Sequence, residues 1–185
     1  TTMCVARSAI FTLGVIPAPC GAPVGPLDEL CGKTLVVWSI EAARAASAID
    51  RVVVATDEPE VASLAAAAGA SVVPGHDRAG NDQRSEETGL VRLLDHLEQH
   101  EDVRPEVLVL LRYSAPLTSP EDIDGTVGTL VAEAADSALS VTEFSGFLWQ
   151  AGSDGAAGFN HDEAARFAER PHHASLLETG AVYAM

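Results

Sequence analysis

Short runs of β-branched and other apolar residues alternate along this chain with longer, alanine-rich segments whose apolar positions repeat at helical spacing. Continuous apolar runs, such as those at 51–56 and 106–111, are typical of strands that are buried on both faces of a parallel sheet. The pattern predicts strands at 8–16, 51–56, 70–73, 106–111, 137–142 and from 181 onward. It predicts helices at 34–48, 58–68, 85–100 and 119–134. Residues 144–173 mix glycine, acidic and aromatic residues, and no element is predicted there.

Strands that alternate with helices of ten to fifteen residues predict an α/β fold: a mainly parallel sheet covered by helices on both faces, in three layers. Ligands of such sheets bind at the carboxyl ends of the strands. Three predicted loops lie at such ends, at 17–33, 56–57 and 112–119, and we expect the functional site there. At the last of them, Ser119-Pro-Glu-Asp predicts a helix start, so Asp122 and Asp124 are interpreted as first-turn acids rather than metal ligands.

The charge balance narrows the classes of partner. Eleven Lys and Arg residues against 27 Asp and Glu residues give a formal net charge of −16. Nucleic acids and anionic membranes need a basic face, so neither is an expected partner. No apolar run approaches the roughly 20 residues that span a bilayer, and the first fifteen residues lack the pattern of a secretory signal. Three cysteines without metal-ligand spacing argue against a disulfide framework. We expect a cytoplasmic protein.

The first loop, at 17–33, follows the first strand, where a phosphate-binding loop would lie. Its small residues Ala18, Cys20, Gly21 and Ala22 would let backbone N–H groups approach phosphates. Four prolines remove donors, however, and the first cation is Lys33, the only lysine in the chain. The loop has neither the Walker spacing nor the dinucleotide fingerprint. A purely structural loop is the alternative, and without an identifiable histidine partner Cys20 is interpreted as a small filler rather than a nucleophile.

A series of motifs along the chain is collinear with one enzyme family. They read I-P-A at 16–18, G-K-T-L-V-V-W-S-I-E-A-A at 32–43, D-R-V-V-V-A-T-D at 50–57, A-G-A-S-V-V at 68–73, L-L-R-Y-S-A-P-L at 110–117, P-E-D-I-D at 120–124, D-S-A-L-S-V-T-E at 136–143 and E-T-G-A-V-Y-A at 178–184. In this order they resemble the CMP-sialic acid synthetases (acylneuraminate cytidylyltransferases). The resemblance covers nearly the whole chain, which is therefore interpreted as a single cytidylyltransferase-like domain at 1–185.

This resemblance implies a Rossmann-like nucleotidyltransferase fold and a reaction with CTP. An oxygen of an acidic sugar, or of a related acid such as a phosphonate, would attack the α-phosphate, and pyrophosphate would leave with the help of Mg²⁺. The resemblance also implies a homodimer formed through the segment after strand 137–142. The site residues it implies are Lys33 and Arg112 for catalysis; Ala18, Cys20, Gly21, Ala22, Arg78, Ser85, Ser114 and Ala115 for nucleotide binding; and Thr179 and Tyr183 for substrate binding.

The departures from the family pattern concern charged and polar positions. Pro19 and Pro23 stand where the family loop has arginine and lysine, Arg112 replaces a base-contacting glutamine, and Thr179 replaces asparagine. The chain also ends at Met185, before the family's metal-binding aspartates, so we expect the family's C-terminal segment to be missing and name no metal ligand. Each charge-assisted hydrogen bond to the triphosphate that is lost weakens the binding free energy of the nucleotide by roughly 1.5–3 kcal/mol.

These departures leave three interpretations open. The chain is a diverged cytidylyltransferase, a catalytically silent nucleotidyltransferase-like binding or oligomerisation module, or an enzyme on the same scaffold that uses another nucleotide. Arg112 is interpreted either as a substitute cation in the cleft or as a surface arginine paired with an acid.

Overall fold

The structure is a computed structural model that describes residues 10–19, 23–75, 83–153, 155–161 and 175–185, with side chains not described at 83–86. The chain divides into two compact units. The larger unit comprises residues 1–140 and 180–185, and the smaller unit comprises residues 141–179. No helix in the described ranges combines the length and apolar character needed to cross a bilayer.

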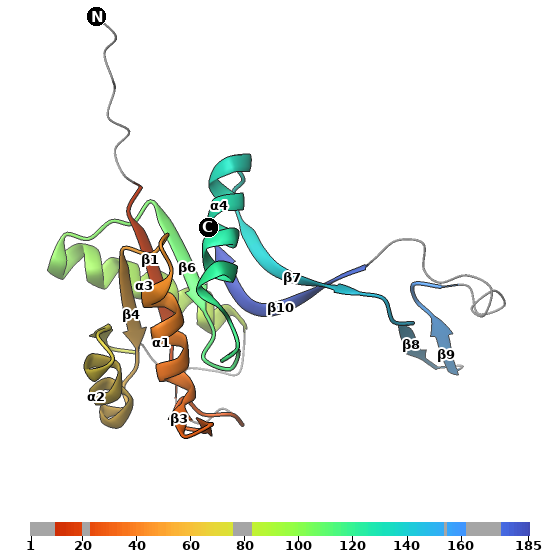
Figure 1. The fold of residues 1–185 in the computed structure, drawn as a ribbon, viewed down its shortest axis with the longest axis horizontal. Coiled ribbons are helices and arrows are strands. Elements are labelled where there is room, and N and C mark those ends of the chain that lie inside the picture. The colour runs from red at the N-terminus through yellow and green to blue at the C-terminus, as the bar shows by residue number, and fades with distance from the viewer. Residues whose placement is uncertain (1–9, 20–22, 76–82, 154, 162–174) are drawn as a thin grey trace, which may run out of the picture. The chain divides into compact units, whose positions relative to one another are not determined.

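The sheet of the larger unit has six strands in the order β5-β4-β1-β6-β10-β7 (Figure 1). Its strands are β1 (Thr12–Pro17), β4 (Arg51–Ala55), β5 (Ser71–Val73), β6 (Val107–Leu111), β7 (Ala138–Phe144) and β10 (Ser175–Ala184), the last two of which continue into the smaller unit. The first four strands in the sheet order pair in parallel, and β10 is antiparallel to β6. The predicted mainly parallel α/β fold is therefore confirmed.

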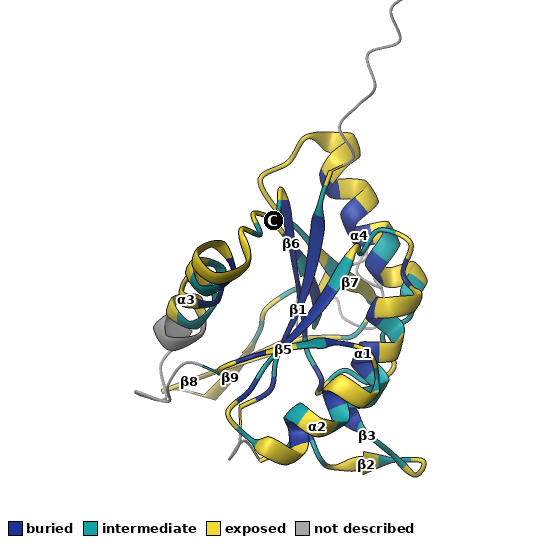
Figure 2. Cartoon of the chain, turned by 90° about the vertical axis from the view of Figure 1, so that its left-hand side faces the viewer, coloured by how far each residue is buried: buried dark blue, intermediate teal, exposed yellow. Residues whose placement is uncertain are grey.

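Helices cover both faces of this sheet, as Figure 2 shows. They are α1 (Leu35–Ala45), α2 (Pro59–Ala67), α3 (Gln83–Glu101) and α4 (Pro120–Glu133). On one face, buried residues of α1, α2 and α4 pack against the strands, whereas Leu93 and Leu97 of α3 pack against Leu13, Val15 and Val53 on the other. Alternate residues of each central strand thus enter different cores, which explains why these strands are continuously apolar rather than alternating.

The start of α4 is fixed as its sequence predicts. The amide of Asp122 donates to the Ser119 hydroxyl over 3.2 Å, and the Ser119 amide donates back to the Asp122 carboxylate over 2.9 Å. This capping box is followed by Pro120 at the beginning of the helix. Asp122 is therefore a first-turn acid, as expected, and its carboxylate also takes part in the capping box.

Asp124 connects α4 to the end of α1. Its carboxylate accepts hydrogen bonds from the Ser47 amide (3.0 Å), the Ser47 hydroxyl (2.7 Å) and the Ala48 amide (2.8 Å). Partial burial favours a raised pKa, but the bonds from the Ser47 hydroxyl and the two amides outweigh it, and the pKa of Asp124 lies below its ordinary value. The interpretation of Asp124 as a first-turn acid is therefore wrong: it lies beyond the first turn of α4 and is a charged link to the segment after α1.

The structure differs from the predicted elements in three places. The loop at 17–33 contains a hairpin of β2 (Glu29–Leu30) and β3 (Lys33–Thr34), whose two turn residues Cys31 and Gly32 have φ of 54° and 77°. The last strand, β10, begins at 175 rather than 181. In the smaller unit, β8 (Trp149–Gly152) and β9 (Gly155–Gly158) pair as a hairpin where no element was predicted. The hairpin strands have two to four residues and no run of β-branched apolar residues, so the sequence gives no strand signal for them.

The β8–β9 hairpin is held by a side-chain network of its own. The side-chain oxygen Oδ1 of Asn160 accepts from the Leu148 amide over 2.8 Å. The side-chain nitrogen Nδ2 of Asn160 donates to the Gly146 carbonyl over 3.0 Å. The His161 ring packs edgewise against Phe147 and Trp149. Such contacts leave no periodic signal, which explains why residues 144–173 carried no prediction.

Candidate functional site

The carboxyl ends of β1, β4 and β6 lie side by side because the three strands are parallel neighbours. The segments that follow them, residues 18–28, 56–58 and 112–118, are here called the carboxyl edge. This is the location that the α/β pattern predicts for a ligand site. Ala18, one of its predicted site residues, is fully buried directly after β1.

Thr56 joins the first two segments of the carboxyl edge. Its buried hydroxyl donates to the Ala18 carbonyl over 3.0 Å and accepts from the Glu58 amide over 3.2 Å. The Ala18 amide in turn donates to the Ala55 carbonyl over 2.9 Å. Thr56 therefore positions the start of the first loop, a role that the sequence analysis did not assign to it.

Gly75, just after β5, packs directly against the backbone of Thr56. A Cβ atom at Gly75 would lie 2.9 Å from the Thr56 Cα and 3.1 Å from its backbone nitrogen. No side chain fits in that space, because both neighbouring atoms belong to the main chain. Gly75 is thus required for the close approach of two segments at the carboxyl edge.

Tyr113 joins the third segment to the first loop. Its ring is buried with a core cluster, and its hydroxyl donates to the Val24 carbonyl over 3.1 Å. The two residues are 89 positions apart, so this bond fixes the first loop against the end of β6. In the sequence Tyr113 appears only as part of the motif at 110–117, with no role of its own. A single aromatic residue after a buried strand gives no signal that its hydroxyl reaches a distant loop.

Arg112 is the first residue after β6 and is half-buried. Its amide donates to the Ala181 carbonyl over 3.2 Å, and its carbonyl accepts from the Ser39 hydroxyl over 3.4 Å. Its backbone is therefore anchored to both β10 and α1. It contributes to a crevice with no room for a water molecule, lined by Ser39, Ala42, Leu111, Arg112, Thr118, Ile123 and Ala181.

Ser114 and Ala115 follow in a tight turn. Ser114 is exposed, whereas the Ala115 amide donates to the Arg112 carbonyl over 3.0 Å. The Ala115 carbonyl accepts from both the amide (3.1 Å) and the hydroxyl (2.7 Å) of Thr118. These bonds give the turn a defined shape and leave Ser114 as its solvent-facing polar side chain.

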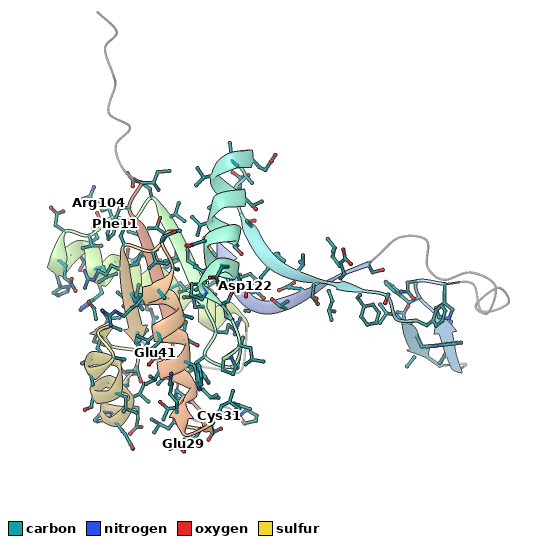
Figure 3. All side chains as sticks on the ribbon, viewed as in Figure 1. Phe11, Glu29, Cys31, Glu41, Arg104 and Asp122 are labelled. Carbon is teal, nitrogen blue, oxygen red and sulfur yellow. The ribbon has the colours of Figure 1, made fainter. Side chains whose placement is uncertain are left out.

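Lys33 lies on β3 of the hairpin, and its ammonium group is engaged by α1. It forms an ion pair with Glu41, and its Nζ lies 3.9 Å from the centroid of the Trp38 ring. Trp38 is half-buried and donates from Nε1 to the Leu30 carbonyl over 3.0 Å. Figure 3 labels Glu41 on α1 and Cys31 at the hairpin. To contact a phosphate, Lys33 would have to exchange the Glu41 carboxylate for it.

Two amides at the N-terminus of α1 and one amide of the first loop are also used internally. The amides of Leu35 and Val36 donate to the carbonyls of Asp28 (2.8 Å) and Pro26 (3.1 Å), and the Gly25 amide donates to the Asp28 carboxylate (2.8 Å). A helix N-terminus ordinarily offers such amides to an anion. Here the first loop satisfies them itself, so phosphate binding by these amides would require the loop to rearrange.

The remaining predicted site residues are placed only in part. Tyr183 lies on β10 opposite Leu110 in the larger unit and is half-buried, and Thr179 is exposed in the smaller unit. Ser85 lies in α3, with its side chain outside the description. Cys20, Gly21, Ala22 and Arg78 lie outside the described residues. In the described ranges, no group of three or more His, Cys, Asp or Glu side chains is arranged to hold a metal ion.

Comparison with known proteins identifies what this chain is similar to. The sequence profile described as "Cytidylyltransferase" matches residues 23–169. The chain is 34% identical to the 3-deoxy-manno-octulosonate cytidylyltransferase of Anaeromyxobacter dehalogenans over 64% of this chain and 46% of that protein. It is 35% identical to the enzyme of the same name from Chlamydia trachomatis over 71% of this chain and 50% of that protein. It is 26% identical to the N-acylneuraminate cytidylyltransferase A of Danio rerio over 88% of this chain and 38% of that protein.

Solved structures share the fold. A CMP:2-keto-3-deoxy-manno-octonic acid synthetase in complex with CTP superposes with a TM-score of 0.62 at 19% identity, over 94% of this chain and 73% of that chain. A 4-diphosphocytidyl-2C-methyl-D-erythritol synthase from Anaerococcus prevotii superposes with a TM-score of 0.64 at 13% identity, over 96% of this chain and 70% of that chain. The chain spans about half the length of the first curated relatives it matches.

Proposed function

The chain belongs to the cytidylyltransferase family, and from that premise we propose that it couples CTP to an acidic sugar, giving a CMP conjugate and pyrophosphate. The observation that carries this proposal is the profile match at 23–169, which includes two of the three segments of the carboxyl edge and most of the first loop. The curated relatives named above act, by their names, on 3-deoxy-manno-octulosonate or N-acylneuraminate, which are both acidic sugars. The collinear motifs favour an acceptor of the sialic acid type, and a related acid is the alternative acceptor.

In the proposed reaction the oxygen of a sugar hydroxyl forms a bond to the α-phosphorus of CTP, and the proton of that hydroxyl is lost to water. The bond between that phosphorus and the bridging oxygen to the β-phosphate breaks, and pyrophosphate leaves with the electron pair. Catalysis of phosphoryl-type transfer is mainly positioning and charge neutralisation. Arg112 is the proposed cation for this task because its backbone is fixed from two sides at the end of β6. Lys33 would add a second positive charge after releasing Glu41.

The nucleotide is proposed to bind along the first loop and the turn after β6. Ala18 and the turn at Ser114 and Ala115 lie at the same edge of the sheet. Cys20, Gly21, Ala22, Arg78 and Ser85 complete the proposed nucleotide site, and Thr179 and Tyr183 the acceptor site. Mg²⁺ is proposed to arrive with the triphosphate, since this ion is commonly held by substrate phosphates and water with few protein ligands.

A catalytically silent binding module is the second candidate. The ion pair of Lys33 with Glu41 and the internal use of the Gly25, Leu35 and Val36 amides favour it. In this alternative the first loop is a structural element, and the scaffold is retained for binding or oligomerisation.

A pyrophosphate-release assay with the whole chain separates these candidates. We expect release with CTP, Mg²⁺ and an acidic sugar, tested with N-acetylneuraminate and 3-deoxy-manno-octulosonate, and no release with a neutral hexose. Arg112→Ala should lower kcat with CTP at least about tenfold, whereas Glu133→Ala, an exposed residue of α4, should not change it. Release with another nucleotide would reassign the donor. If no pyrophosphate is released with any of the four nucleotides and calorimetry shows no binding of CTP, the catalytically silent binding module is the candidate that remains.

We further propose a homodimer. The smaller unit exposes several large apolar side chains: Phe147, Leu148, Trp149, Phe159, Leu176 and Leu177. Exposed apolar residues gathered in one small unit are typical of association surfaces. Sedimentation equilibrium should give twice the monomer mass of 19.2 kDa, and Phe159→Ser should shift the protein toward monomer. Sedimentation at monomer mass would refute the dimer.

A further inference from the structure

The first loop is poor in backbone donors, and hydrogen bonds from outside the loop hold it at two points. Proline removes an amide donor at four of its positions, 17, 19, 23 and 26. At the beginning of the loop, the Ala18 carbonyl accepts from the Thr56 hydroxyl over 3.0 Å. Further along, the Val24 carbonyl accepts from the Tyr113 hydroxyl over 3.1 Å. Other segments of the carboxyl edge thus supply the hydroxyl donors to both carbonyls.

The Tyr113 hydroxyl is carried by a well-packed part of the molecule. The ring is 7% exposed and lies in the core cluster that also contains Leu35, Val36 and Leu111. Close packing holds such a ring in one rotamer. The preceding residue is fixed as well, because the Arg112 carbonyl accepts from the Ser39 hydroxyl of α1. The position of the Tyr113 hydroxyl is therefore set relative to the end of β6.

The segment that follows Val24 is folded as a turn against α1. The Asp28 amide donates to the Gly25 carbonyl over 3.2 Å, and the Gly25 amide donates to the Asp28 carboxylate over 2.8 Å. The first two amides of α1 donate to carbonyls of the same turn. Residues 19–23, which include part of the proposed nucleotide site, therefore connect two anchored carbonyls along the chain.

Tyr113 belongs to the turn that carries other residues of the proposed nucleotide site. Arg112 precedes it, and Ser114 and Ala115 follow it. A hydrogen bond of 3.0 Å from the Ala115 amide to the Arg112 carbonyl gives this turn a defined shape. The bond from Tyr113 to Val24 therefore joins the two halves of the proposed site, which are the turn after β6 and the first loop.

We propose that Tyr113 is a positioning residue for nucleotide binding, whose hydroxyl holds the first loop in place against the turn after β6. This role rests on the proposed function and adds a residue to its nucleotide site. Without the hydroxyl, the Val24 carbonyl can bond to water, because Val24 lies on the surface, and the loop would sample other positions. A nucleotide would then bind only the fraction of molecules whose loop is in place, and its apparent affinity would fall accordingly.

Steady-state kinetics of the whole chain with Tyr113→Phe test the proposal, because this change keeps the buried ring and removes the hydroxyl. We expect the KM for CTP to rise about fivefold, as for the loss of one neutral hydrogen bond, and kcat at saturating CTP to stay within about twofold of the parent. Thr129→Val is the matched control. The Thr129 hydroxyl also donates to a backbone carbonyl, that of Gly125, over 2.9 Å, but on the exposed surface of α4. Its removal should change neither constant.

Amide hydrogen exchange of the protein without nucleotide gives a second readout that does not depend on activity. In Tyr113→Phe the amides of Gly25 and Asp28 should exchange about fivefold faster than in the parent, whereas the amides of β4 and α4 should keep the parent rates. A hydroxyl that served only global stability would instead accelerate exchange in the loop, in β4 and in α4 alike, and that result would overturn the positioning role.

Pyrophosphate release by the parent separates this proposal from the proposed function. If the parent is active and Tyr113→Phe shows an unchanged KM or unchanged exchange in the loop, the positioning role is overturned and the proposed function stands. A KM raised equally by Thr129→Val, or a kcat lowered without a change in KM, also overturns the positioning role. If the parent releases no pyrophosphate with any nucleotide, the proposed function fails, and the positioning role fails with it whatever the exchange rates are.

Discussion

At the scale of single residues, a few polar side chains connect segments that are far apart in the sequence. Thr56 bonds to Ala18, Tyr113 bonds to Val24, and Asp124 bonds to Ser47 and Ala48. Each of these side chains forms a hydrogen bond with a backbone group that lies beyond the end of a strand or a helix. A loop at the end of a parallel strand needs such bonds because the sheet ladder no longer uses its amides and carbonyls.

Asp124 provides the sharpest test at this scale. Asp124→Ala removes a carboxylate that accepts three hydrogen bonds and leaves the Ser47 and Ala48 amides without their partner. We expect the free energy of unfolding to fall by about 1–2 kcal/mol, as for the loss of a charged capping residue. Urea denaturation at pH 7 measures it, and Glu133→Ala on the same helix is the control with no expected effect. Equal stability of both variants would contradict the assigned role.

The pH dependence of the same variant follows from the lowered pKa. A carboxyl whose folded-state pKa is depressed contributes stability above its unfolded pKa of about 3.9, and this contribution disappears as the pH falls through the folded value. The difference in unfolding free energy between parent and Asp124→Ala should therefore be constant from pH 7 to about 5 and shrink below about pH 4. A difference that persisted unchanged at pH 2 would indicate packing rather than charge.

At the scale of elements, most strands and helices that were predicted correctly have long hydrophobic periods, and the short β5 was predicted from its adjacent valines. β4 and β6 are continuous apolar runs, and their residues alternate between two buried cores. The two hairpins were missed because their strands have two to four residues and contain no run of β-branched apolar residues like that of β5. The carboxyl edge was predictable as a location, since it follows from parallel strand order. Its internal bonds were not, because Tyr113 and Thr56 act on partners at least 38 positions away.

The sequence pattern also does not reveal which amides of a loop are already used. Lys33 is readable as the first cation after the loop, but its pairing with Glu41 depends on the hairpin that places it against α1. In the same way, the Gly25 amide is taken by Asp28 through a turn of the loop. The number of charged residues near a site can therefore be counted from the sequence. Whether those charges and amides are open to a ligand depends on the local geometry.

Replacing two different glycines by alanine should have opposite effects on stability, because one glycine is closely packed and the other lies on an open helix surface. Gly75→Ala places a methyl group 2.9 Å from the Thr56 Cα, so we expect a loss of about 1–3 kcal/mol of stability from forced backbone movement. Gly128→Ala, in α4, meets no atom within 4 Å and should stabilise the protein by about 0.5–1 kcal/mol through helix propensity. Chemical denaturation of both variants checks the two signs. A neutral or stabilising Gly75→Ala would show that the loop after β5 can move away from Thr56 at no cost.

At the scale of the whole molecule, the dominant electrostatic fact is the formal net charge of −16. The ion pairs identified in the described residues are few, and they lie on the surface: Arg51 with Glu101, Arg104 with Glu98, and Lys33 with Glu41. The bond to Arg51 lowers the pKa of Glu101, with partial burial acting in the opposite direction. Surface pairs of this kind contribute about 0–1 kcal/mol each, so they do not offset the repulsion within a chain that has 27 acidic and 11 basic residues.

Added salt should therefore stabilise this protein rather than destabilise it. Raising the ionic strength from about 0.01 M to about 0.1 M shortens the Debye length from about 30 Å to about 10 Å, which screens repulsion between distant carboxylates more than attraction within a 2.7 Å pair. A gain of about 1 kcal/mol corresponds to a rise in Tm of about 2–4 °C for a chain of this size. Thermal unfolding in NaCl and in choline chloride should show the same rise, since screening depends on ionic strength and not on ion identity. A Tm that fell with salt would mean that the three surface ion pairs outweigh the net charge, and a rise with only one of the salts would point to specific ion binding.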